Sequence, residues 1–279
     1  MTKSRWVNIY KPSGNMSLTE SIKGLNFVEW EIPSVSTVNN DSEIQGRDGV
    51  IPGAINFAPF SLVLKFYYSG NDMADLNLFS QTIKSIVHSR ELYYVSHSDM
   101  PDFKYAVNKA EIEWEIINHG DATFSVTFNC YKGYAESLYS TDDYNLMSNF
   151  WQYESGLISD TDIEYIHDKN KFKIYNASSD IINPLLDHNL DIYMTVTAPN
   201  GFRMLNKTNK TEFNYLGKQL KKEGTILLNK TYPYMKNKRI GKDTDKGYIV
   251  LDKGFNEIEL SGDGLIVSEI KYDFNFIYR

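Results

Sequence analysis

Short runs in the first half of the chain alternate hydrophobic and polar residues, and Pro and Gly residues separate them. Strict alternation is typical of half-buried β-strands, and Pro and Gly punctuate regular structure instead of continuing it. The pattern predicts strands at residues 6–10, 26–32, 60–68, 91–95, 103–107 and 123–131.

One segment follows a helical period instead. Asp72 is a plausible N-cap, and Asp75 stands in the first turn, where a carboxylate complements the helix dipole. Apolar residues then recur every three or four positions, at Leu76, Phe79, Ile83, Ile86 and Val87. This stripe predicts an amphipathic helix over residues 72–90.

Residues 111–116 alternate acidic and apolar side chains. The alternation turns Ile112, Trp114 and Ile116 towards a core, and it turns three carboxylates towards water, those of Glu111, Glu113 and Glu115. Three carboxylates on one face invite a catalytic interpretation. Nothing in the sequence pairs a protonated acid with an ionised one, so a solvated edge or an interface is the favoured interpretation.

Residues 35–58 are dense in turn formers, among them Asn39-Asn40-Asp41, Gly46, Asp48-Gly49 and Pro52-Gly53. This density predicts a long loop or an open hairpin. Long loops within compact domains usually carry a function.

The alternating pattern stops near residues 138–143, and we place a domain boundary there, giving domains 1–140 and 141–279. Residues 144–153 fit either a short helix or an irregular linker. The second half predicts further strands at 163–166, 172–175, 190–197, 211–215, 225–229, 247–251, 256–260 and 270–278. Short strands separated by turn signals are typical of an antiparallel β-sandwich.

Composition supports a folded, mainly β protein. The 279 residues are 42% hydrophobic and 14% aromatic, which favours packed strands over a disordered chain. The single cysteine, Cys130, excludes an intramolecular disulfide, and no Cys/His spacing resembles a zinc site. We expect Cys130 to be a small buried side chain.

Charge is distributed unevenly along the chain. A net charge of −7 argues against a general nucleic-acid binder. Between Arg203 and Lys242, however, eleven basic residues face two acidic ones, a local charge of +9. This basic segment could contact phosphates or a polyanionic cell-wall polymer, or it could be a solvated face or a contact with an acidic neighbouring subunit.

Signals for export and for chemistry are missing from the pattern. The N-terminus has no apolar region after its basic residues, and the longest apolar stretch, residues 60–68, is too short for a membrane helix, so we expect a protein made and kept in a cytoplasm. Residues 243–247 begin like a calcium loop, but the twelfth position is Gly254, so a turn is favoured. The five histidines are scattered. We expect no catalytic residue, no cofactor and no metal ion.

The order of several segments is nevertheless distinctive. Arg47-Asp-Gly49 and Ile51-Pro-Gly53 precede a strand ending in Phe66-Tyr-Tyr68, and Arg90-Glu-Leu-Tyr-Tyr-Val95, Tyr105-Ala-Val107 and Gly133-Tyr-Ala-Glu-Ser137 follow the helix. Downstream stand Phe172-Lys-Ile-Tyr-Asn176, Asp191-Ile-Tyr-Met-Thr-Val-Thr197, Gly254-Phe-Asn-Glu-Ile258 and Phe274-Asn-Phe-Ile-Tyr-Arg279. In this order, the segments resemble the distal tail proteins of siphophages, the bacteriophages with long, non-contractile tails.

The resemblance implies a fold and an assembly. The fold is an N-terminal β-sandwich or split barrel with one α-helix, followed by a C-terminal galectin-like β-sandwich. The family implies a homo-hexameric ring in the virion, at the tail tip, assembled in the bacterial host cytoplasm. One ring face would meet the tail tube protein and the other the tail-associated hub protein, with receptor-binding or baseplate proteins as further partners and DNA only in transit.

Within that interpretation, our candidate subunit contacts are Arg47, Asp48, Gly49, Glu111, Glu113 and Glu115. The acidity of residues 1–140, eleven basic against sixteen acidic side chains, would suit a channel through which DNA slides without sticking. The alternative is a carbohydrate-binding adhesin that uses exposed aromatics such as Trp151, Tyr232 or Tyr234. A glycoside hydrolase on a β-sandwich is a third and weaker hypothesis, since it needs two carboxylates at a defined separation.

Overall fold

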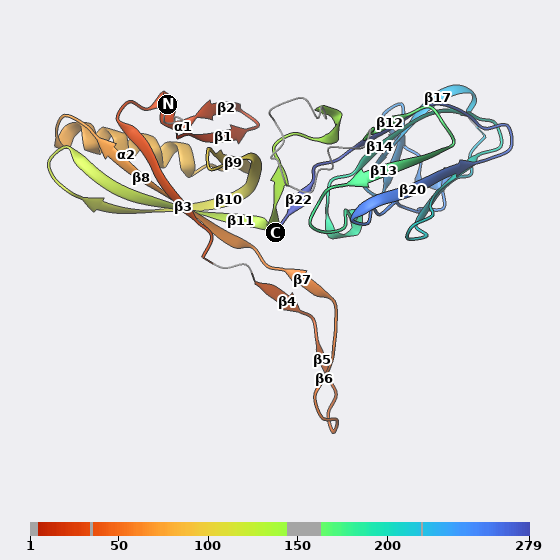
Figure 1. The fold of residues 1–279 in the computed structure, drawn as a ribbon, viewed down its shortest axis with the longest axis horizontal. Helices are drawn as coiled ribbons and strands as arrows, with labels where there is room; N and C mark the ends of the chain where they lie inside the picture. The colour runs from red at the N-terminus through yellow and green to blue at the C-terminus, as the bar shows by residue number, and fades with distance from the viewer. Residues whose placement is uncertain (1–4, 34–35, 144–162, 219) are drawn as a thin grey trace. The chain divides into compact units, whose positions relative to one another are not determined.

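The computed structural model describes residues 5–33, 36–143, 163–218 and 220–279. These residues divide into two compact units, both built mainly of β-strands (Figure 1). The N-terminal unit runs to Leu138 and includes Arg279, and the C-terminal unit runs from Tyr139 to Tyr278. Among the described residues, no helix has both the length and the hydropathy that crossing a membrane requires.

One antiparallel sheet forms the body of the N-terminal unit, in the order β2-β1-β9-β10-β11-β8-β3. Its strands are β1 (Val7–Lys11), β2 (Gly14–Ser17), β3 (Leu25–Glu31), β8 (Phe60–Ser69), β9 (Tyr93–His97), β10 (Met100–Ile116) and β11 (Asp121–Ser137). The two strands predicted at 103–107 and 111–116 are one strand, β10, whose register against β11 shifts on both sides of Val107. These register shifts are β-bulges, and the alternation of polar and apolar residues breaks there although the strand continues.

Helix α2 (Met73–Val87) confirms the predicted amphipathic helix and ends three residues earlier than expected. The Asp72 side chain caps it by accepting a hydrogen bond of 2.9 Å from the Asp75 backbone N–H. The helix buries four residues of the predicted stripe, Leu76, Phe79, Ile83 and Val87. A second, one-turn helix, α1 (Leu18–Ser21), was not predicted.

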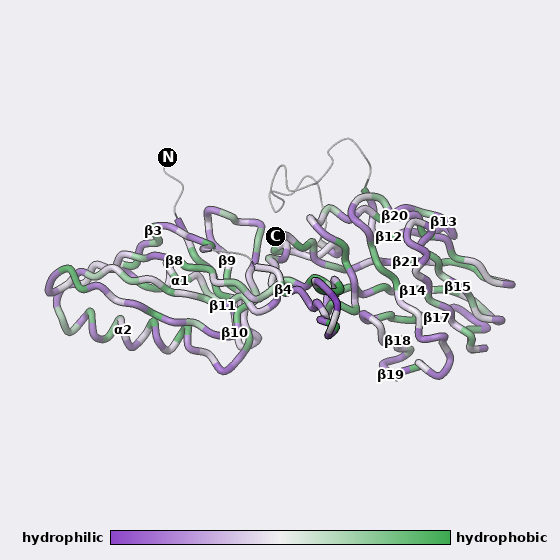
Figure 2. The backbone as a smooth tube through the Cα atoms, turned by 90° about the horizontal axis from the view of Figure 1, so that it is seen from below, coloured by the Kyte–Doolittle hydropathy of each residue, from purple (hydrophilic) through white to green (hydrophobic). Residues whose placement is uncertain are grey.

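An aromatic layer joins α2 to the sheet. The Phe79 ring stacks on Tyr68 of β8 with centroids 3.8 Å apart and meets Phe124 of β11 at 5.5 Å. Trp114 of β10 stacks on the same Phe124 at 4.5 Å. Hydrophobic and hydrophilic positions alternate along these strands (Figure 2), so one face of the sheet packs under α2 and the other carries polar side chains.

The C-terminal unit is an antiparallel sandwich of two sheets, ordered β12-β21-β14-β17-β18-β19 and β13-β20-β15-β16. The first sheet contains β12 (Ile166–His167), β14 (Asp191–Ala198), β17 (Leu220–Asn229), β18 (Tyr232–Met235), β19 (Lys238–Arg239) and β21 (Ile266–Asp273). The second contains β13 (Lys171–Asn176), β15 (Phe202–Asn206), β16 (Glu212–Tyr215) and β20 (Gly254–Ser261). The remaining short elements are η1 (Thr141–Asp143), η2 (Pro184–Leu186), η3 (Gly241–Asp243) and β22 (Ile277–Tyr278).

Buried amides explain one wrong prediction. Residues 247–251 are apolar and buried at Ile249, Val250 and Leu251, but they form no strand and pair only through an isolated bridge at Leu251. The Asn206 and Asn209 side chains donate to the Val250 carbonyl at 2.8 and 2.9 Å. These bonds satisfy the carbonyl without a neighbouring strand. Of the predicted strand at 163–166, only Ile166 is in a strand, and the helix or linker predicted at 144–153 lies outside the described residues.

The aromatic layer generates a prediction of stability. Replacing Phe124 by Ala (Phe124→Ala) should lower the free energy of unfolding of the N-terminal unit by about 3–5 kcal/mol, because a buried ring is lost and a cavity remains. Urea denaturation followed by tryptophan fluorescence measures this change. Ser125→Ala, one position along β11 on the polar face, should change it by less than about 0.5 kcal/mol. Equal effects of the two substitutions would contradict the assignment of the two faces.

The buried His97 in β9 generates a second prediction. Its ring packs against Trp30, Phe27 and Tyr105 at 5.0, 5.8 and 5.9 Å, and neither ring nitrogen has a partner among the described residues. Burial lowers the pKa of His97 to about 4. Because the unfolded chain takes up this proton near pH 6.5 and the folded chain only near pH 4, stability falls as the pH drops between these values.

The variant His97→Leu should lose this part of the pH dependence, a difference of about 2–3 kcal/mol between pH 7 and pH 4 by the linkage relation. The measurement is the urea midpoint of both proteins at several pH values in that window. Parallel curves for the two proteins would show that His97 does not titrate with a lowered pKa.

Candidate functional site

Residues 36–57 form a hairpin, which we name the arm. Strand β4 (Thr37–Asn39) pairs with β7 (Ile55–Phe57), and further out β5 (Ser42–Glu43) pairs with β6 (Val50–Ile51). The two ladders follow one another away from the sheet of the same unit (Figure 1). All residues of the arm are exposed, so the arm has no core of its own.

Backbone bonds hold the middle of the arm together. The Asn40 N–H donates to the Ala54 carbonyl at 3.1 Å, and the Gly53 N–H donates to the Asp41 carboxylate at 2.9 Å. A Cβ at position 53 would lie 1.8 Å from the Asn40 carbonyl oxygen. Only glycine therefore allows the two strands to approach this closely.

The tip of the arm holds one set of predicted contact residues, Arg47, Asp48 and Gly49. The Arg47 N–H donates to the Ile44 carbonyl at 3.1 Å, and Gly49 has a φ of 76°, in the left-handed region that favours glycine. The structure places these residues in an exposed turn.

Six large apolar side chains of the arm are 38–63% exposed, namely Val38, Ile44, Val50, Ile51, Ile55 and Phe57. Turn formers predicted the position of this segment, but no pattern in the sequence marked these side chains as exposed. One sequence feature could nevertheless have identified them. Aliphatic residues occur in this turn-rich segment without the sustained period of 2 that is typical of a strand or the period of 3.6 that is typical of a helix. A cluster of exposed apolar side chains of this kind marks an interaction surface.

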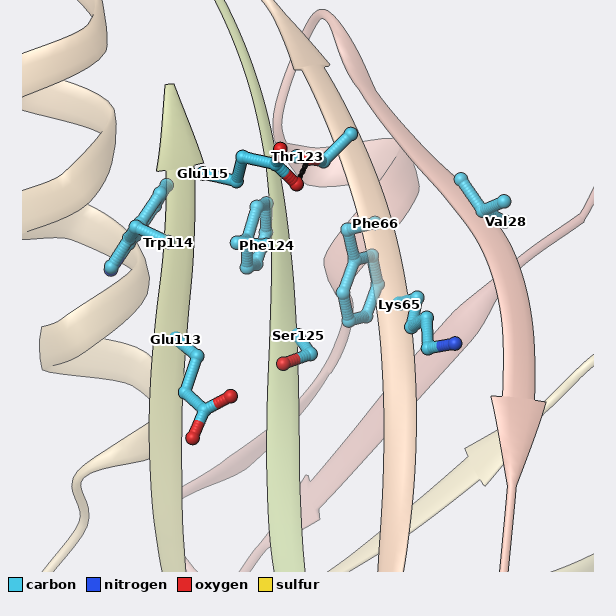
Figure 3. Close-up of a pocket in the computed structure, with 9 residues that line it drawn as sticks. All are labelled: Val28, Lys65, Phe66, Glu113, Trp114, Glu115, Thr123, Phe124 and Ser125. Atoms are coloured by element: carbon cyan, nitrogen blue, oxygen red, sulfur yellow. Dashed lines mark hydrogen bonds between the residues drawn. The ribbon is translucent and has the colours of Figure 1, made fainter. Parts of the chain in front are cut away.

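The second set of predicted contact residues lies on the polar face of the sheet. Figure 3 shows a shallow hollow of about 490 Å³ there, with Glu113 and Glu115 of β10, Thr123 and Ser125 of β11, and Lys65 of β8 around it. In the same view Trp114 points towards the helix, away from Glu113 and Glu115. The hollow is thus a polar depression in one sheet face, and the aromatic layer lies behind it.

Two of the three carboxylates of this face, those of Glu111 and Glu115, have local partners. Lys109 forms an ion pair with Glu111 and lowers the pKa of that carboxyl, first through the hydrogen bond and then through its charge. The Thr123 hydroxyl lies 3.5 Å from a Glu115 carboxylate oxygen. These contacts form no arrangement of a protonated acid beside an ionised one, and the geometry fits a contact surface better than a catalytic centre.

The other chemical candidates have structural partners. The Asp245 carboxylate accepts from the backbone N–H groups of Asn214 and Gly247 at 3.0 and 2.8 Å, so the calcium-like sequence is a turn. Cys130 is buried, as expected. Over the described ranges, no group of three or more His, Cys, Asp or Glu side chains could hold a metal ion.

The basic segment divides into paired and unpaired cations. Arg203 pairs with Glu212, Lys207 lies 3.4 Å from Glu259, and Lys230 pairs with Asp187. In the part of the chain that the structure describes, no ion pair is formed by Lys236, Lys238, Arg239 or Lys242. These four cations lie together, at the hairpin of β18 and β19 and the turn after it, whereas Lys210, Lys218, Lys221 and Lys222, which form no ion pair among the described residues either, lie elsewhere in the segment.

The arm geometry generates a third prediction. Gly53→Ala should open the β4–β7 ladder, because the new methyl group collides with the Asn40 carbonyl. Hydrogen exchange of the Asn40 amide should accelerate at least about tenfold. The free energy of unfolding of the unit's body should change by less than about 0.5 kcal/mol, since the arm is exposed.

Ser42→Ala, an exposed substitution in the same arm, is the control and should leave the exchange rate unchanged. Protection at Asn40 that survives the glycine substitution would contradict the close approach of the two strands.

Residues 14–130 match the family model of the phage tail protein RIFT-related domain. No curated protein matches the sequence. Among solved structures, the crystal structure of the Dit (gp 19.1) protein of phage SPP1 is similar with a TM-score of 0.66 and 13% identity, over 97% of this chain and 99% of that chain. The baseplate of phage p2 in its activated conformation with Sr matches with a TM-score of 0.46 and 12% identity, over 97% of both chains.

The family model covers most of the N-terminal unit, and the similarity to the SPP1 protein extends over both units. The predicted mainly β class with a principal helix in the first unit is confirmed by the same comparison. Residues 14–130 thus match a phage tail protein RIFT-related domain, and the chain has along nearly its whole length the fold of the Dit protein of phage SPP1, which confirms the resemblance indicated by the order of its segments.

Proposed function

We propose that the chain is an architectural protein without enzymatic activity in the tail tip of a siphophage. Six copies form a ring around a channel, with the N-terminal units in the ring and the C-terminal units projecting outward. The tail-protein domain and the distal tail fold support this proposal. The ring is an adaptor between the tail tube protein and the tail-associated hub protein, and its outer units anchor receptor-binding or baseplate proteins.

The exposed apolar arm is the observation that carries the proposal. A two-stranded hairpin is at best marginally stable in water without a surface to pack on. The Arg279 guanidinium covers one side of the Phe57 ring at 3.3 Å from its centroid, but all residues of the arm are exposed and six of them are large and apolar. A neighbouring copy of the same chain can cover them, and repeating this head-to-tail contact around an axis closes a ring.

The polar sheet face provides a second contact surface. We propose that Glu111, Glu113 and Glu115 take part in contacts between copies, together with Arg47, Asp48 and Gly49 of the arm tip. The acidic balance of residues 1–140 also fits a channel that DNA crosses, because carboxylates repel phosphates and give DNA no binding sites. DNA is accordingly a passing molecule and not a ligand, and no cofactor takes part.

The adhesin alternative finds less support. Trp151 lies outside the described residues. The Tyr232 ring is half exposed, but the Arg239 guanidinium lies 4.5 Å from its centroid and 5.8 Å from that of Tyr234. The two rings that could stack on a sugar thus already hold a cation on one side.

Light scattering after size exclusion tests the ring. The mass should be near six times 32.2 kDa, about 193 kDa, or should reach it when the tube and hub proteins are added. Ile55→Asp should lower the fraction of assembled chain at least tenfold, because a charge replaces the most exposed apolar side chain of the arm.

Asn56→Asp adds the same charge to the next residue of β7, on the side of the ladder that Val38 shares and that lies opposite Ile55 and Phe57, and should change assembly less. A monomer at every concentration, both alone and with the two partner proteins, would overturn the ring. Equal losses in the two variants would show that charge, and not apolar burial on one side of the arm, determines assembly.

A further inference from the structure

Two unpaired cations of the basic segment, Arg239 and Lys242, border a hollow that the proposed ring does not explain. The hollow measures about 910 Å³ and lies between the β18–β19 hairpin and the η3 turn. Its lining includes Tyr232, Arg239, Lys242 and Lys246. Asp243 also lines it, so three cations face one acidic residue.

Arg239 is held in a fixed orientation beside this hollow. Its guanidinium lies over Tyr232 with its carbon 4.5 Å from the ring centroid, and its Nε–H donates to the Tyr234 hydroxyl at 3.1 Å. No hydrogen bond occupies its two terminal nitrogens within the described residues. A guanidinium that is oriented by aromatic rings and keeps its outer N–H groups free can receive a tetrahedral oxyanion through two parallel bonds.

The backbone fixes the hairpin that carries Arg239. Lys236 and Asn237 join β18 to β19, and both have positive φ values, 48° and 61°. Two consecutive residues in this region form the tight turn that matches the twist of a hairpin. Lys242 and Lys246 also line the hollow, and neither has an ion-pair partner in the described parts of the chain. Three cations thus line one hollow beside a hairpin turn that the backbone fixes.

We propose that this hollow binds phosphate groups of a phosphodiester-linked polyol polymer, with Arg239 as the bidentate ligand of one phosphate and Lys242 and Lys246 as supporting charges. A polyol phosphate chain is thin and flexible, so it can bring single phosphates into a concave site. Its neutral units carry hydroxyl groups, which fit the polar residues at the hairpin, among them Thr231.

Two other polyanions fit the site less well. Single-stranded nucleic acid binds through bases stacked on free aromatic faces, and the nearest rings already contact Arg239 on one side. An acidic protein segment needs apolar pockets for its anchoring side chains. The apolar residues of this hollow, Pro233 and Ile240, are themselves buried and offer little area.

The experiment measures binding of the full chain to poly(glycerol phosphate) by calorimetry at about 0.15 M salt. Poly-glutamate and oligo-dT of equal charge number are the competing polyanions, and dextran is the neutral control. Arg239→Gln should weaken binding at least about tenfold, the cost of a lost charge-assisted pair of hydrogen bonds. Arg239→Lys should also weaken it, because the charge remains but the planar fork is lost.

Lys222→Gln is the matched control. It removes the same charge from the same unit at an exposed position of β17 outside the hollow, and it should change affinity less than about twofold. Equal unfolding temperatures of all variants establish that they are folded.

The proposal is supported if poly(glycerol phosphate) binds tightest and only the Arg239 variants weaken it. It is overturned if no polymer binds, if Lys222→Gln weakens binding as much as Arg239→Gln, or if poly-glutamate or oligo-dT binds as tightly. Tight binding of poly-glutamate would assign the surface to an acidic protein, and tight binding of oligo-dT would assign it to nucleic acid. The ring is tested separately by mass, so failure of either proposal leaves the other intact.

Discussion

The antiparallel ladder between β10 and β11 is the constraint on which the N-terminal unit depends. A strand turns alternate side chains to opposite faces, so β10 and β11 form one face of each kind over residues 109–116 and 122–129, where their register is unbroken. The aromatic layer of Phe79, Trp114 and Phe124 unites one face with α2. The second face has to remain polar in a free chain, which is why it can also serve as a contact surface in an assembly.

The periodic pattern of apolar residues predicts which side chains of this fold are buried, but it does not predict which groups form hydrogen bonds with the backbone. The stripe of α2 gave the correct face, and along the acidic alternation at 111–115 the carboxylates are exposed and Ile112 and Trp114 half-buried, as predicted. Ile116, which was expected to face the core, is 59% exposed because it ends β10. The prediction at 247–251 was wrong because Asn206 and Asn209 satisfy the Val250 carbonyl from a distance in sequence. Apolar content shows that a segment is buried but not which group bonds its backbone.

The sequence predicted where the arm lies but not which of its apolar side chains are exposed. Turn formers located the arm, and the resemblance directed attention to Arg47 at its tip. The exposed Ile55 and Phe57 gave no signal of burial in a core, and in the proposed ring the surface that covers Ile55 belongs to a neighbouring copy. A period in the sequence records burial within one fold, so side chains that are buried only between copies appear as irregular hydrophobic positions in a loop.

The basic segment shows why charge summed along a sequence is a poor guide to a binding surface. Its +9 includes Arg203, Lys207 and Lys230, and the sandwich places each beside a carboxylate. The positions of the cations without an ion pair depend on tertiary structure. A tight turn places Arg239 beside Tyr232 and Tyr234, and Lys242 of η3 lines the same hollow as Arg239. A cation contributes to recognition when the fold orients it and leaves it unpaired, and only the folded sandwich shows which cations these are.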